Sequence, residues 1–70
     1  MITLKAARVN KNLRLKDAAD AVGVSRQTII HWEAGTTQPL ASQFLTLCKL
    51  YGADPYSIKL EVQYVFGKLS

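Results

Sequence analysis

Apolar residues recur along most of this chain at intervals of three and four, the spacing expected of helices that bury one face. The clearest stripe consists of Phe44, Leu47, Cys48 and Tyr51, and Gly52 follows it directly. Glycine at that position favours a helix end, because it adopts a left-handed backbone without steric cost. The pattern predicts an all-α domain of five helices that pack their apolar stripes together.

Capping residues place the boundaries of these helices. Thr3 and Ser25 carry hydroxyl groups that can cap the first and third helices. Asp54 and Pro55 form a cap and first turn for a short fifth helix that continues through Ile58. The second helix is expected over about residues 15–22. The helix ends are expected at residues that tolerate a left-handed backbone, namely Asn12, Gly23, Gly35 and Gly52.

The pattern changes after Lys59, where Leu60, Val62, Tyr64 and Phe66 occupy alternate positions, as in a β-strand. A lone strand that exposed aromatic side chains would promote aggregation, so the segment should be covered. We favour pairing between two copies of the chain through Val62, Tyr64 and Phe66. The alternative is a tail that folds back over its own helices.

Length and charge narrow the class of protein. Seventy residues form one domain, with residues 1–59 expected as the helical domain and residues 60–70 as a strand or tail. The net charge is +4, and the part through Gly35 holds six basic residues against three acidic ones. This excess favours an anionic partner such as nucleic acid.

Other classes find little support in the sequence. The single cysteine, Cys48, has no partner for an internal disulfide or a metal site, so we expect a reducing cytoplasm, no metal and no cofactor. No apolar run approaches the roughly 20 residues of a membrane span, and no secretory leader is apparent. The only histidine, His31, has no serine or cysteine nucleophile beside it, so we expect neither an enzyme nor a small-molecule substrate.

The segment from Val22 to Glu33 is the most informative for function. A glycine, then a capping serine, then apolar Ile29 and Trp32 indicate a tight turn between two helices. The opposite side of the second of these helices carries Arg26, Gln27 and His31, whose side chains can form directed hydrogen bonds to base edges in a major groove. We therefore predict a DNA recognition helix.

Each candidate has an alternative interpretation. Arg26 could contact a phosphate or remain solvated, Gln27 could be an ordinary surface residue, and His31 could have no partner. Ile30 is apolar where a solvent-facing group is expected. It could touch the methyl group of a thymine or a neighbouring side chain.

A second set of residues is expected to hold the DNA backbone. Basic side chains near the start of the second helix add to the partial positive charge of the helix terminus, and polar side chains follow the third helix. The candidate phosphate contacts are Arg14, Lys16, Ser25, Thr36, Thr37 and Gln38.

Residues 4–58 resemble the Cro/CI-type helix-turn-helix family of phage and bacterial repressors. The chain has five elements in the same order and with the same spacings as in that family. The residues that carry the resemblance are Leu4, Ala7, Arg8, Leu13, Ala18, Ala19, the run from Val22 to Ile29, the run from Trp32 to Gly35, Pro39 and the stretch from Leu47 to Gly52.

The resemblance implies a lambda-repressor-like fold and sequence-specific binding of duplex DNA, usually as a homodimer on a two-fold operator. Arg26, Gln27 and His31 fall where the family reads bases, and Arg8 and Glu33 fall where it often forms an ion pair. Leu15 stands where members commonly have glutamine, so a side chain that often grips a phosphate and braces the base-reading residues is absent. The alternative function is a protein-interaction module, such as an antirepressor or antitoxin-like regulator, that acts through the C-terminal strand.

Overall fold

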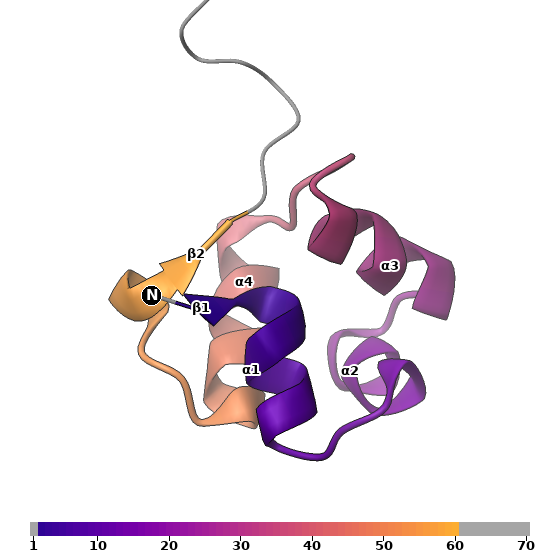
Figure 1. The fold of residues 1–70 in the computed structure, drawn as a ribbon. Coiled ribbons are helices and arrows are strands. Elements are labelled where there is room, and N and C mark those ends of the chain that lie inside the picture. Colours follow the sequence, from indigo (N-terminus) through magenta and orange to yellow (C-terminus); the bar gives the residue numbers. More distant parts are fainter. Residues whose placement is uncertain (1, 61–70) are drawn as a thin grey trace, which may run out of the picture.

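The computed structural model describes residues 2–60 and is mainly helical (Figure 1). The described residues form four α-helices rather than the five expected. Their bounds are α1 Leu4–Asn10, α2 Leu15–Val22, α3 Arg26–Ala34 and α4 Ala41–Tyr51.

The expected fifth helix is a single 3₁₀ turn, η1 (Pro55–Ser57). The Asp54 carboxylate accepts a hydrogen bond from the Tyr56 N–H at 3.0 Å, so the predicted cap is present. The Ser57 N–H donates to the Asp54 carbonyl at 2.8 Å, which is the three-residue spacing of a 3₁₀ turn. An α-helix does not develop because the next residue, Ile58, is buried and already extended in a strand.

A two-stranded parallel sheet joins the two ends of the described chain. Strand β1 (Ile2–Thr3) pairs with β2 (Ile58–Lys59), with Ile2 opposite Ile58 and Thr3 opposite Lys59. The sequence predicted extended structure only after Lys59 and gave no sign of β1. Val62, Tyr64 and Phe66 lie outside the described residues, so their proposed role in a dimer stays a prediction.

The predicted helix caps are confirmed. The Thr3 hydroxyl accepts from the Ala6 N–H at 3.1 Å at the start of α1. Beyond the end of α1, Asn12 adopts the left-handed backbone with φ +60°. Gly23 closes α2 in the same region of backbone space, with φ +73°. These local choices set the corners between successive helices.

The core lies where α2 packs against α3 and α4, with α1 alongside α4 (Figure 1). Ile29 of α3 and Leu47 and Cys48 of α4 are its largest fully buried side chains. Lys11 extends its ammonium group toward Gly52 at the carboxyl end of α4, where helix carbonyls carry partial negative charge. The remaining buried apolar residues are Leu4, Ala7, Ala18, Ala19, Trp32, Tyr51 and Ile58.

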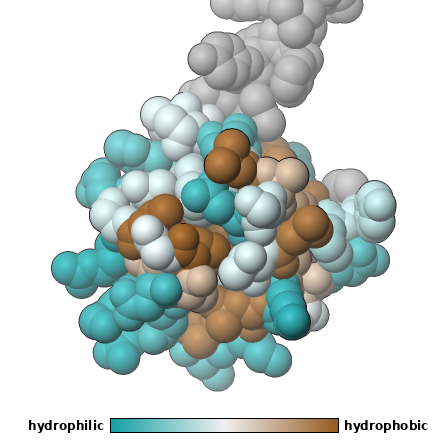
Figure 2. Space-filling model, turned by 180° about the vertical axis from the view of Figure 1, so that it is seen from behind, coloured by the Kyte–Doolittle hydropathy of each residue, from teal (hydrophilic) through white to brown (hydrophobic). Residues whose placement is uncertain are grey.

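Apolar surface also reaches the exterior among hydrophilic side chains, as the face opposite to that of Figure 1 shows (Figure 2). The large apolar side chains exposed in the described part of the chain are Ile2, Val9, Ile30, Leu40, Leu45 and Tyr56. Over residues 2–60, none of the helices has the length and apolar character needed to cross a membrane.

The turn between α2 and α3 can be tested at Gly23. An added Cβ there would meet no atom within 4 Å, so Gly23→Ala should be penalised only through its backbone, at φ +73°. A left-handed conformation costs an L-residue roughly 1 kcal/mol or more, which should lower the urea midpoint by about 1 M. Gly23→Asn, whose side chain tolerates this conformation better, should lose less. An alanine variant as stable as the parent would contradict this account of the turn.

Candidate nucleic-acid interface

The corner between α2 and α3 is closed by hydrogen bonds on both sides. The N–H groups of Gly23 and Val24 donate to the carbonyl of Ala19, and the Val24 bond is 3.0 Å long. On the other side, the Ser25 hydroxyl accepts from the Thr28 N–H at 3.1 Å. The predicted cap at Ser25 is thereby confirmed. The two helices meet at a fixed corner because neither terminus is left without a partner.

Helix α3 has one face in the core and one in solvent. Ile29 and Trp32 are 1% and 5% exposed, as the sequence predicted. Arg26, Gln27 and Ile30 lie on the solvent side and are exposed, Ile30 by 40%. The side chains with base-reading chemistry are therefore held by a helix whose other face is immobilised.

His31 is half-buried and hydrogen-bonded to Gln27 one turn earlier. The Gln27 Nε2 and His31 Nε2 atoms are 3.0 Å apart. The donor and acceptor roles in this contact follow from the tautomer of the imidazole. The contact joins two candidate base-reading side chains along one line of the helix surface.

A surface hollow of about 470 Å³ opens beside these side chains. Its walls come from the first turn of α2 and the first half of α3. The lining residues are Leu15, Ser25, Arg26, Gln27 and Ile30. The resemblance implied that the glutamine replaced by Leu15 braces the base-reading residues, and Leu15 does lie beside them. Sequence reasoning missed that Leu15 and Ile30 line one hollow.

A buried ion pair ties α3 to α1. The Arg8 Nε donates to Glu33 Oε2 at 2.7 Å and its Nη2 donates to Oε1 at 3.2 Å, so the contact is bidentate. The third guanidinium nitrogen, Nη1, donates to the carbonyl of Leu13 at 2.9 Å. The two charged side chains are only 10% and 8% exposed. The ion pair implied by the family resemblance is present.

Burial and this pair set the protonation of nearby groups. The hydrogen bond to Glu33 raises the pKa of Arg8 despite the opposing effect of burial. Burial raises the pKa of Tyr51 to about 12, and the Glu33 carboxylate adds to the effect. Burial also raises the pKa of the Cys48 thiol. Tyr51 and Cys48 are therefore neutral near pH 7, and a buried neutral thiol is a poor nucleophile.

The basic residues near the start of α2 both have acidic partners. Lys16 Nζ lies 2.9 Å from Asp20 Oδ2, and this hydrogen bond raises the pKa of Lys16. Arg14 Nε lies 3.9 Å from Asp17 Oδ2, which also accepts the Arg14 backbone N–H at 2.8 Å. The i,i+4 spacing of Lys16 and Asp20 was visible in the sequence, but its effect on the phosphate candidates was overlooked.

The remaining phosphate candidates divide between the two ends of α3. Ser25 lies at the start, and Thr36, Thr37 and Gln38 follow the end, where all three are exposed. The Thr36 N–H donates to the His31 carbonyl at 3.0 Å across left-handed Gly35, so this bond closes the end of α3 and the loop begins there. The structure thus does not gather all the candidates into one cluster.

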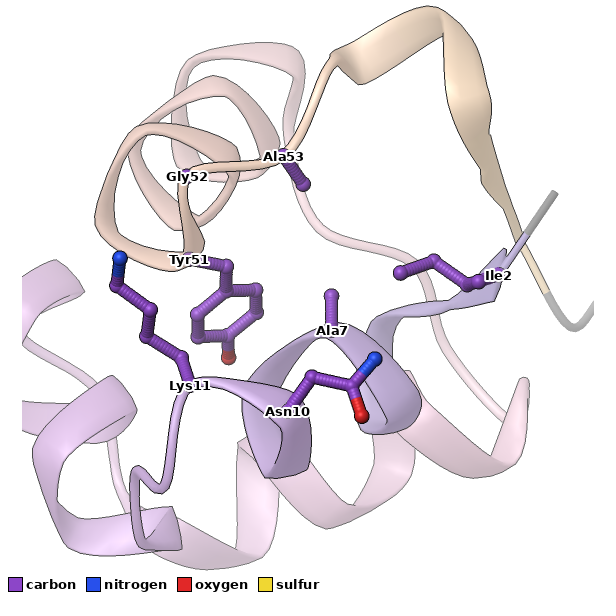
Figure 3. A pocket seen from close by; sticks show the side chains of 7 residues that line it. All are labelled: Ile2, Ala7, Asn10, Lys11, Tyr51, Gly52 and Ala53. Carbon is purple, nitrogen blue, oxygen red and sulfur yellow. The ribbon is translucent and has the colours of Figure 1, made fainter.

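A second hollow, of about 250 Å³, lies between α1 and the end of α4 (Figure 3). Lys11, Asn10 and the Tyr51 ring border it, with Ala7 and Ile2 on the apolar side. It has no nucleophile beside a base. Among residues 2–60 the structure contains no cluster of three or more histidine, cysteine or acidic side chains that could hold a metal ion.

The capped corner, the buried face of α3 and its polar solvent face together define a helix-turn-helix domain. The family model described as helix-turn-helix matches residues 4–58. The chain belongs to this family, in its XRE branch, and is a DNA-binding transcription regulator. Comparison with curated proteins and with solved structures gives no match.

The ion pair predicts a large effect for Glu33→Gln. This change leaves the buried Arg8 charge without a counterion, which should cost about 3–5 kcal/mol of unfolding free energy. Replacing both partners, as Arg8→Met with Glu33→Leu, should restore part of the loss, because no buried charge remains. Urea unfolding of the two variants and the parent measures both effects. A single variant within about 1 kcal/mol of the parent would show that the pair behaves like an exposed one.

The acidic partners predict that Asp20→Asn strengthens binding to duplex DNA. The change removes a negative charge from the surface expected to face phosphates and frees the Lys16 ammonium for them. Asp54→Asn is the matched control, since it changes the net charge equally at the turn before η1, and asparagine can still cap that turn. Fluorescence anisotropy at low salt should show a severalfold tighter complex for Asp20→Asn than for the control. Equal affinities would argue against phosphate contact at Lys16.

Proposed function

We propose that this regulator is a sequence-specific repressor that binds a two-fold operator as a homodimer, in the manner of small phage Cro-like proteins. Helix α3 lies in the major groove. Arg26 donates two hydrogen bonds to a guanine, and Gln27 pairs with an adenine. His31 and Ile30 contact adjacent positions. The repressor acts in the cytoplasm of a bacterial or phage-infected cell by occupying the operator.

The division of α3 into two faces carries this proposal. The core holds Ile29 and Trp32, so α3 cannot rotate about its axis without exposing a tryptophan. The exposed Arg26 and Gln27 side chains are then presented in one direction relative to the rest of the domain. Presentation of this kind is needed for bidentate contacts, because each contributes about 1–3 kcal/mol of discrimination only when its geometry is met.

The length of α3 supports a dimer. Nine residues span about 13 Å of helix, which corresponds to roughly four base pairs of B-form DNA. Four base pairs recur too often in a genome to define one site. Two copies on half-sites about one helical turn apart, roughly 34 Å, would read twice as many positions.

Phosphate contacts are proposed from Arg14, Lys16 and Ser25 at one end of the interface. Thr36, Thr37 and Gln38 are proposed at the other end, where the loop carries no basic side chain. Affinity would then depend strongly on the few cations near α2. It should fall steeply as salt rises, because phosphate contacts release counterions.

Selection of bound duplexes from a random pool, with the full chain, tests the proposal. The selected sites should share a two-fold sequence, and Arg26→Ala with Gln27→Ala should reduce the affinity for them to that for unrelated duplexes. Lys5→Ala with Asn10→Ala is the control, since it removes one positive charge and one amide from the exposed surface of α1. That control should retain the preference for the selected site.

Two results would contradict the proposal. One is equal affinity of the parent chain for every duplex in the pool. The other is no binding to any duplex at low salt.

A further inference from the structure

The hollow at the first turns of α2 and α3 has an apolar wall that can form no hydrogen bond to a base. Leu15 and Ile30 both line it. We infer that these two side chains form a contact site for the C5-methyl group of a thymine in the operator, an inference that rests on the proposed function.

The exposure of Ile30 is the first support. Its neighbour Ile29 is 1% exposed in the core, whereas Ile30 is 40% exposed. Leu15 of α2 is half-buried and packs against the core, so core contacts hold its side chain in place. The two side chains therefore present an apolar surface that the rest of the described chain leaves open to solvent.

The polar rim of the hollow is the second support. Arg26 precedes Ile30 by four residues and Gln27 precedes it by three, so all three share one side of α3. Arg26 itself lines the hollow, and Lys16 directly follows the lining residue Leu15 in α2, so two cations belong to the segments that form it. The hollow therefore combines an apolar patch with positively charged and amide side chains. Such a surface fits a ligand that carries an apolar group on a polyanionic backbone better than it fits the apolar surface of another protein.

Thymine is the base that meets this description. Of the four bases, only thymine carries a methyl group at the floor of the major groove. When α3 brings Arg26 or Gln27 to a base, Ile30 on the same side of the helix approaches an adjacent base pair. The operator should therefore contain a thymine next to a base read by one of these residues.

Replacement of thymine by deoxyuridine tests the inference, because it removes the methyl group and keeps every hydrogen bond of the base pair. Each thymine of the selected duplex is replaced in turn, and binding of the full chain is followed by fluorescence anisotropy. One position in each half-site should lose about fourfold in affinity, which corresponds to about 0.8 kcal/mol for one buried methyl group. The other thymines should have little effect.

Variants assign the contact to the hollow. In Ile30→Ala, and likewise in Leu15→Ala, replacing that thymine by deoxyuridine should reduce the affinity little or not at all. Leu45→Ala is the matched control, because Leu45 is also an exposed apolar residue of a helix but does not line the hollow. It should retain the fourfold loss. Thermal unfolding of each variant shows whether it is folded, and the duplex series with the parent chain stands without the variants.

The outcomes separate this inference from the proposed function. Sequence-specific binding that no deoxyuridine replacement weakens overturns the methyl contact and leaves the repressor proposal intact. A sensitive thymine whose effect persists in both Ile30→Ala and Leu15→Ala also overturns it, because another residue then makes the contact. A selected site without thymine has the same consequence. Failure to bind any duplex overturns both.

Discussion

The guanidinium group of Arg8 is the constraint on which the geometry of this domain depends. Its three nitrogens donate to two segments beyond α1, namely the Glu33 carboxylate near the end of α3 and the Leu13 carbonyl before α2. A buried ion pair of this kind adds little net stability, since desolvation offsets much of the attraction. Its value here is geometric, because a misplaced α3 would leave a buried charge without a partner.

This constraint explains how one short helix can serve two purposes. The inner face of α3 is held by apolar packing at Ile29 and Trp32 and by the ion pair at Glu33. The outer face can then carry Arg26, Gln27 and Ile30 without any of them being needed for folding. Substitutions on this exposed face leave the core untouched, so the proposed base contacts could change without loss of the fold.

Much of the fold was accessible from the sequence because the helix boundaries depend on local chemistry. The caps at Thr3 and Ser25, and the left-handed residues Asn12 and Gly23, all occur where the pattern placed them. The parallel pairing of Ile2 with Ile58 was not accessible, since it joins residues 56 positions apart and spans two residues per strand. The same pairing cuts the expected fifth helix to one 3₁₀ turn.

The candidate site was predictable in residue type and less so in arrangement. The helical period places Arg26, Gln27, Ile30 and His31 on one side of α3, and this follows from sequence alone. The hydrogen bond between Gln27 and His31 has the i,i+4 spacing of a single helix, so the helical period allows it as well. The entry of Leu15 into the hollow beside Arg26 and Gln27 depends instead on side-chain placement across the corner between α2 and α3. Such placement arises from the angle between α2 and α3, which no local pattern specifies.

Nuclear magnetic resonance of the isotope-labelled full chain, titrated with the selected duplex, tests the central claim most directly. The account predicts the largest shifts at Arg26, Gln27, Ile30 and His31, while the Nε–H of Arg8 remains slow to exchange in both the free and bound states. Shifts concentrated in β1 and η1, or a rapidly exchanging Arg8 Nε–H in the free protein, would contradict it.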